Sequence, residues 1–148
     1  MRMFNTSLFD ESTFYTQFSK DLLHAEREVV IESPFITINR VKKLAPTFNK
    51  LIKRGVKVFI ITRQPSLHDY PMKKQSEEMI QFFEEIGIQV LVTQNNHHRK
   101  LAIIDRDILW EGSLNILSQN NSREIMRRTI GDNHAQTIFN FLRLDRFI

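Results

Sequence analysis

Two short polar motifs lie close together in the second half of the sequence. His98 and Lys100 directly precede the apolar run 101–104, which indicates a buried strand. Because side chains alternate along a strand, His98 and Lys100 are expected to leave the same face, one pleat apart. A further short strand is expected at 107–111, and the tetrapeptide Gly-Ser-Leu-Asn at 112–115 follows it. The sequence therefore predicts an imidazole beside an ammonium group at the start of a strand.

These residue types suit the chemistry of phosphodiester bonds. An imidazole such as His98 can attack phosphorus near neutral pH. Lys100 and the Asn115 amide can donate hydrogen bonds to non-bridging phosphate oxygens, and Ser113 adds a hydroxyl group. Gly112 allows the backbone to approach closely. Charge that develops on phosphorus in the transition state would meet fixed donors, which is usually the largest catalytic contribution.

The spacing of these residues resembles the signature of the phospholipase D superfamily. The pattern is His-x-Lys, four residues, Asp, six residues, Gly-Ser-x-Asn, and it is filled by His98, Lys100, Asp105, Gly112, Ser113 and Asn115. Glu124 occupies the place of a downstream acid that the family commonly has, whereas the Asn expected two residues earlier is Ser122. The resemblance implies a two-step displacement. One histidine forms a covalent phosphohistidine, a second protonates the leaving oxygen, and water then releases the product.

The sequence contains one copy of this motif, whereas many members of the superfamily contain two. The resemblance therefore implies that the second histidine comes from another subunit. We expect a twofold homodimer in which the two His98 side chains face each other, one neutral and one cationic. Glu124 is expected to hydrogen-bond a ring nitrogen of His98. The motif makes Asp105 a catalytic candidate as well, but its opposite strand parity favours a structural, hydrogen-bonding role.

The neighbouring His97 raises the question of a metal site. No cysteine and no nearby His-x-x-x-Glu pattern accompanies the His97-His98 pair, so we interpret His97 as a bystander. The expectation is a site without metal or other cofactor, and therefore hydrolysis that persists in EDTA.

Length and composition predict one domain, residues 1–148, with an ordinary globular balance of 41% hydrophobic and 26% charged residues. The absence of cysteine excludes disulfides and thiolate metal sites. No apolar run approaches the roughly 20 residues of a membrane span, and residues 1–10 lack the apolar core of a signal peptide. We therefore expect a cytoplasmic protein with no membrane partner.

Apolar periodicity predicts an alternation of helices and strands. Helices are expected at 10–26, 39–54, 75–86 and 131–144, and strands at 29–31, 56–62, 88–93, 101–104, 107–111 and 123–130. Pro46 is expected to kink or restart the second helix, and residues 64–74 to form an exposed loop. The early strand–helix–strand order predicts an α/β fold with a mixed, largely parallel sheet and helices on both faces.

A net charge of +4 and a pI near 9.6 give a mild preference for polyanionic partners. The first hypothesis is a nuclease acting on DNA in preference to RNA, with Arg99, Arg123 and Arg127 as candidate nucleic-acid contacts. The sequence also resembles nuclease-type modules that are fused to helicases or restriction systems, which implies a fused or partner recognition domain. Two alternatives stay open: a nucleic-acid-binding or dimerisation module without turnover, and a phospholipid phosphodiesterase. The sequence does not choose between endonuclease and exonuclease action.

Overall fold

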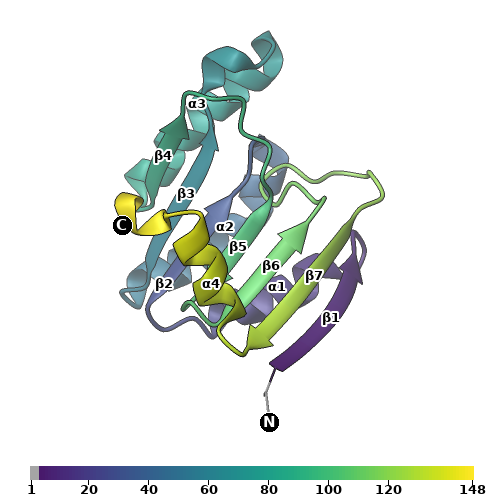
Figure 1. Cartoon of the computed structure of the whole chain (residues 1–148). Helices are drawn as coiled ribbons and strands as arrows, with labels where there is room; N and C mark the ends of the chain where they lie inside the picture. The colour runs from purple at the N-terminus through teal and green to yellow at the C-terminus, as the bar shows by residue number, and fades with distance from the viewer. Residues whose placement is uncertain (1–3) are drawn as a thin grey trace.

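A computed structural model describes residues 4–148 as one seven-stranded sheet with four helices (Figure 1). The strands are β1 (Phe4–Asp10), β2 (Glu28–Glu32), β3 (Lys57–Arg63), β4 (Gln89–Thr93), β5 (Leu101–Ile104), β6 (Ile108–Gly112) and β7 (Ile125–Gly131). The helices are α1 (Phe14–Leu23), α2 (Ile38–Lys53), α3 (Tyr70–Glu85) and α4 (His134–Phe141), with short 3-10 turns η1 (Pro65–Leu67) and η2 (Leu144–Phe147). Residues 1–3, which belong to the predicted domain, lie outside the described residues.

The sheet is mixed, and its strand order is β1-β7-β6-β5-β2-β3-β4. The parallel pairs are β2–β3 and β3–β4, which are joined by the helical crossovers α2 and α3. The other four pairs, β1–β7, β2–β5, β5–β6 and β6–β7, are antiparallel. For β5–β6 and β6–β7 this follows from direct connections without a helix. The mixed α/β fold is as predicted, but its parallel character is confined to one side of the sheet.

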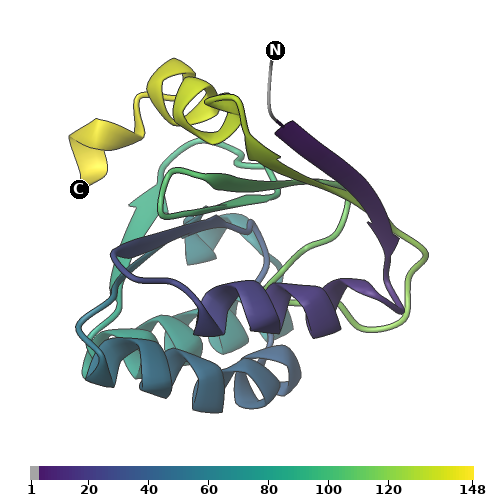
Figure 2. The same cartoon turned by 90° about the horizontal axis from the view of Figure 1, so that it is seen from below.

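Helices cover both faces of the sheet, which agrees with the prediction (Figure 2). Helices α1, α2 and α3 lie on one face, where a large core includes Phe14, Phe18, Phe48, Phe83 and Trp110. Helix α4 lies on the other face, where a smaller core is formed by Phe59, Ile103 and Phe139 among others. The central strand β5 is buried along its whole length, which explains its continuous apolar sequence. Among the described residues, no helix is long and apolar enough to cross a bilayer.

Three features differ from the sequence-based expectations. Strand β1 was not predicted, and it pairs antiparallel with β7 at the edge of the sheet. Helix α3 begins at Tyr70, within the predicted loop, because the Asp69 carboxylate caps it through the Met72 N–H at 3.3 Å. Pro71 suits the first turn of that helix. Helix α2 continues through the exposed Pro46 instead of restarting there.

The two predicted motifs meet where the central strands end, at one border of the sheet that runs across the strands. Glu32 at the end of β2 lies opposite Leu101 at the start of the antiparallel β5, and Leu101 lies opposite Glu111 on β6. The segment 98–100 immediately precedes this row, and the segment 112–115 follows it. We refer to this edge as the site edge; the parallel strand β3 also ends there, and helix α2 begins just after β2.

Candidate active site

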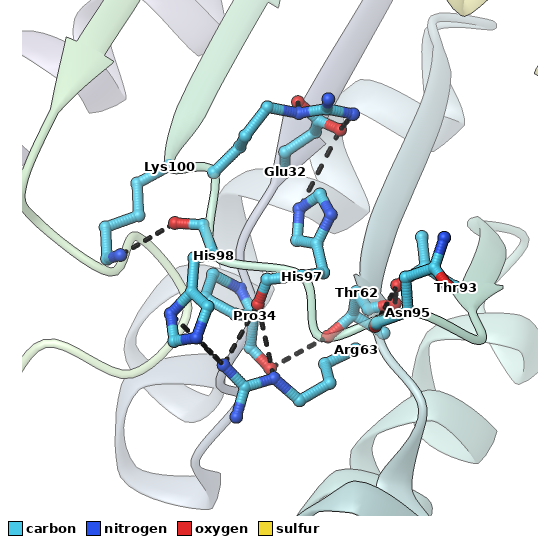
Figure 3. Close-up of polar contacts among 10 residues, drawn as sticks. Glu32, Pro34, Thr62, Arg63, Thr93, Asn95, His97, His98 and Lys100 are labelled. Carbon is cyan, nitrogen blue, oxygen red and sulfur yellow. Dashed lines mark hydrogen bonds and ion pairs between the residues drawn. The ribbon is translucent and has the colours of Figure 1, made fainter.

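His98 and Lys100 lie in the extended segment that enters β5 (Figure 3). His98 is exposed, and Lys100 is half-buried. The Lys100 ammonium donates a hydrogen bond to the His98 main-chain carbonyl over 2.7 Å, which holds the two residues together. The structure therefore places the Lys100 ammonium on the main chain of the residue that carries the accessible imidazole.

Arg63, the last residue of β3, contacts His98 from beneath (Figure 3). Its side chain is 7% exposed, and its Nη2 atom lies 3.1 Å and 3.3 Å from the two ring nitrogens of His98. Nε and Nη2 also donate to the His97 carbonyl over 3.2 Å and 3.0 Å. A guanidinium group can only donate hydrogen bonds, so the ring nitrogen that pairs with it presents its lone pair.

A second histidine, His68, lies near Arg63 through an aromatic contact with Phe35. The guanidinium carbon lies 4.7 Å from the ring centroid of Phe35, and the Phe35 and His68 rings are 5.1 Å apart. Burial, and secondarily the charge of Arg63, lowers the pKa of His68. His68 therefore lies half-buried against Phe35, within a loop that the sequence predicts to be solvated.

Glu32 is a fully buried carboxylate at the end of β2. It accepts two hydrogen bonds from Arg99, from Nε over 3.1 Å and from Nη2 over 2.9 Å. This bidentate pairing compensates the buried charge. Arg99, a predicted nucleic-acid contact, is thus engaged within the protein.

His97 points away from His98 and toward Glu32 (Figure 3). Its Nε2 atom lies 3.8 Å from a Glu32 oxygen, and the residue is buried. Burial lowers the pKa of His97, and the Glu32 carboxylate opposes part of that effect. Residues 4–148 contain no group of three His, Cys, Asp or Glu side chains arranged to hold a metal.

The lowered pKa of His97 predicts a pH-dependent stability. The unfolded chain takes up a proton near the ordinary histidine pKa of about 6.5, whereas the folded chain takes it up only at lower pH. Stability should therefore fall as the pH drops from about 7 to 5. The free energy of unfolding, measured with urea at several pH values, should depend more steeply on pH for the native protein than for His97→Gln. The difference in slope should correspond to the uptake of up to about one proton on unfolding. Equal slopes would contradict a buried, neutral His97.

The Gly-Ser-x-Asn segment joins β6 to β7. A Cβ atom on Gly112 would lie 2.2 Å from the Ile125 carbonyl oxygen, so this close approach requires glycine. The Ser113 hydroxyl accepts the Ile125 N–H over 3.0 Å, so it serves the link between the strands. Asn115 is half-buried, and its Oδ1 atom has no hydrogen-bond partner within residues 4–148. The unpartnered Asn115 atom is an acceptor, so it is not itself a ligand for a phosphate oxygen.

Glu124 does not hydrogen-bond His98 in this structure, in contrast to the prediction. Its main-chain N–H donates to the Glu11 carboxylate over 2.8 Å, and the ring nitrogens of His98 contact Arg63 instead. Glu124 lines a cavity of about 330 Å³ together with Glu11, Ser113 and Arg123. The sequence placed Glu124 by motif position alone and gave no information on the loop that carries it.

Asp105 lies at the opposite end of β5 from His98. Its carboxylate accepts main-chain N–H bonds from Glu26, Arg27 and Glu28 over 2.8–3.0 Å. The four-residue strand that separates it from the site edge spans about 13 Å. Asp105 therefore ties β5 to the start of β2, which agrees with the structural role favoured by its parity and not with a catalytic one.

The other two predicted nucleic-acid contacts are also placed among protein groups. Arg127 on β7 donates to the Thr6 hydroxyl over 3.0 Å. Arg123 shares its cavity with the acidic residues Asp10, Glu11 and Glu124. Arg127 also lies opposite Glu111 in the β6–β7 register, so both arginines have acidic neighbours.

Comparison with known proteins identifies the family. Residues 18–138, most of the chain, match the family described as the cardiolipin synthase, phospholipase D-like domain. The chain belongs to the phospholipase D superfamily. No curated protein matches this phospholipase D-like chain.

Solved structures show the same fold. NucT from Helicobacter pylori is 23% identical, with a TM-score of 0.67 over 96% of this chain and 93% of that one. Nuc from Salmonella typhimurium, a phospholipase D family member, is 16% identical, with a TM-score of 0.76 over 98% and 95%. The phosphatidylserine synthase of Haemophilus influenzae Rd KW20 is 14% identical, with a TM-score of 0.71 over 99% of this chain and 38% of that one. The same fold thus occurs in proteins described as a phospholipase D family member and as a phosphatidylserine synthase. The superfamily to which this chain belongs is one of phosphodiesterases.

Arg63 and Glu32 contact the motif without belonging to it. Each is the polar residue that ends a buried apolar strand, and both strands end at the site edge. A charged residue at the end of a predicted buried strand is the sequence signal that could have identified Glu32 and Arg63.

Proposed function

We propose that the protein is a metal-independent nuclease, acting on DNA in preference to RNA, that hydrolyses phosphodiester bonds through a phosphohistidine at His98. The supporting observation is an exposed imidazole within hydrogen-bond distance of Arg63, with the Lys100 ammonium bonded to the main-chain carbonyl of the same residue, at the site edge. Arg63 donates to the ring nitrogen that carries the lone pair, so this hydrogen bond must be released before that nitrogen attacks phosphorus. The released neutral imidazole is the proposed nucleophile.

The proposed reaction has two displacements. A ring nitrogen of His98 forms a bond to phosphorus while the bond to the leaving oxygen breaks, and that oxygen takes a proton from a second imidazole. Water then attacks the phosphohistidine, loses a proton to the second imidazole and releases the phosphate. Lys100 and the Asn115 amide are proposed to donate hydrogen bonds to the non-bridging oxygens, where charge accumulates.

The second imidazole is proposed to be His98 of another copy of the chain. The exposed position of His98 leaves it accessible to such a copy. In a twofold dimer, a residue near the axis lies next to its own copy. His68 is the alternative proton donor within the chain. Two measurements distinguish the two donors: the oligomeric state of the native protein by sedimentation, and the rate of hydrolysis by a His68→Ala variant. The proposal expects a dimer and retained hydrolysis in that variant.

The activity is tested by incubating the protein in EDTA with plasmid, single-stranded DNA, RNA, phosphatidylcholine and bis(p-nitrophenyl) phosphate. The proposal expects cleavage of the reporter and of nucleic acid, with DNA cleaved faster than RNA. Binding of nucleic acid without any cleavage would support a binding module instead. Hydrolysis of phosphatidylcholine alone would support the lipid phosphodiesterase that the family description and the synthase fold keep open.

Arg63 offers a test of how the imidazole is prepared. Replacing Arg63 with methionine removes the donor to His98, and we expect kcat on the reporter to fall on the order of 10²-fold with KM little changed. Arg63→Lys keeps the positive charge, but a single ammonium group lacks the two donor nitrogens with which the guanidinium bonds to His97 and His98. It should therefore restore only part of the rate. Circular dichroism of both variants checks that they fold. A folded Arg63→Met variant with native kcat would contradict this role.

A further inference from the structure

A basic cavity lies beside the first turn of α2, away from the arginines that the sequence suggested. It has a volume of about 600 Å³, and Arg40, Lys42 and Lys43 contribute three positive charges to its wall. The remaining lining groups are amide and hydroxyl side chains, and no Asp or Glu lines it. Neither lysine forms an ion pair with another residue of the range 4–148. We call this cavity the α2 pocket.

Arg40 is held in place at the wall of the α2 pocket. Its Nε atom donates to the Gln119 carbonyl over 3.0 Å, and its guanidinium carbon lies 3.8 Å from the Tyr15 ring centroid. The Tyr15 hydroxyl is itself anchored, because it donates to the Ile116 carbonyl over 2.6 Å. The two Nη groups of Arg40 have no partner within residues 4–148 and remain available as donors. A planar donor pair on a fixed side chain suits a phosphate group.

The start of α2 adds to this positive field. Thr37 precedes the helix without forming a side-chain cap, and the Ile38 N–H is satisfied by the Gln75 amide oxygen over 3.1 Å. The first turn contains no acidic residue. The positive end of the helix dipole therefore adds to the three cations and is not neutralised by a neighbouring carboxylate.

The α2 pocket is coupled to the motif by the chain that follows β6. The main-chain oxygen of Asn115 accepts the N–H groups of Ser118 and Gln119 over 3.1 Å and 2.8 Å, and both of these residues line the pocket. Thr37 on the opposite wall donates to the Leu117 carbonyl over 3.0 Å. The pocket and Asn115 thus share one short loop at the site edge.

We infer that the α2 pocket binds a backbone phosphate of the nucleic-acid strand whose scissile phosphate lies at His98. The inference rests on the proposed nuclease function for the identity of the ligand. A polynucleotide places further phosphates on either side of the bond that is cut. One cavity without acidic lining contains His98, Arg99 and Arg146 and belongs to the candidate active site itself. The α2 pocket offers a second basic cavity that no Asp or Glu lines, outside that site. Arg99, Arg123 and Arg127 are less suited to this task, because protein groups engage or surround them.

The test measures binding in a His98→Ala background, so that it does not depend on turnover. A fluorescent single-stranded oligonucleotide is titrated with this parent and with its Lys42→Ala/Lys43→Ala derivative at salt concentrations from about 50 to 200 mM. We expect Kd to rise about tenfold in the derivative, and the slope of log K against log salt to shrink by about one to two. A Lys42→Arg/Lys43→Arg derivative should restore both values.

The matched control is Lys50→Ala/Lys53→Ala, which removes the same charge from exposed positions at the far end of the same helix. It should bind like the parent. Equal losses in both double variants, or no loss in either, would overturn the inference. Binding of phosphatidylglycerol vesicles but not of the oligonucleotide would also overturn it. Cleavage by the native protein in EDTA tests the nuclease proposal separately, so failure of one is distinguishable from failure of the other.

Discussion

Replacing His98 with alanine should reduce hydrolysis of bis(p-nitrophenyl) phosphate in EDTA by a factor on the order of 10⁴ or more. The substitution removes the group proposed to bond to phosphorus, and no other described imidazole combines this exposure with a contact to Arg63. Because His98 is exposed, the variant should retain the native circular dichroism spectrum and unfolding midpoint. Initial rates on the chromogenic reporter provide the measurement.

A control for this substitution is His24→Ala, which removes an exposed histidine from the end of α1. It should hydrolyse the reporter at the native rate. A His98→Ala variant within tenfold of the native rate would show that the chemistry does not pass through this side chain.

The largest effect on stability is expected at Asp21, a buried carboxylate of α1 that is 4% exposed. It accepts two hydrogen bonds from Arg128 on β7, both over 2.7 Å, and one from the indole N–H of Trp110 on β6 over 2.8 Å. Asp21→Ala would leave a mostly buried guanidinium and a buried N–H without their acceptor. We expect the free energy of unfolding to fall by about 3–5 kcal/mol. Urea unfolding at neutral pH measures it.

The double variant Asp21→Leu/Arg128→Met should recover much of this loss, because no uncompensated charge then remains. The exposed i,i+4 pair Lys73–Glu77, 3.9 Å apart, provides the comparison. Glu77→Ala should change the free energy of unfolding by less than about 1 kcal/mol. A loss at Asp21 as small as this would contradict its role as the link between α1 and the sheet.

Sequence reasoning succeeds here where the local pattern and the final environment agree. Strand β5 is buried throughout and its sequence is uniformly apolar, and α2 carries a regular apolar stripe that faces the core. It fails where tertiary contacts decide the outcome. Strand β1 exists because β7 offers it a pairing edge, and its own residues 5–10 are mixed in polarity. The start of α3 depends on the Asp69 cap, which the prolines around it obscured.

The candidate site shows the same division. Spacing along the chain suffices to place His98 and Lys100 together, because they lie two residues apart next to a strand. It cannot show that Arg63, from a strand two positions away in the sheet, reaches the same ring. It also cannot show that Arg99 turns inward to a buried carboxylate on β2. These contacts depend on the order of strands, which the sequence does not specify uniquely.

The central claim is that His98 bonds covalently to phosphorus. The most direct test mixes the protein with a phosphorus-labelled oligonucleotide in EDTA, quenches during turnover and locates the label on the intact chain by mass spectrometry. The account predicts an adduct at His98 that is lost in acid, persists in alkali and is absent from His98→Ala. Rapid turnover with no such adduct, or an adduct that the His98→Ala variant also forms, would contradict it.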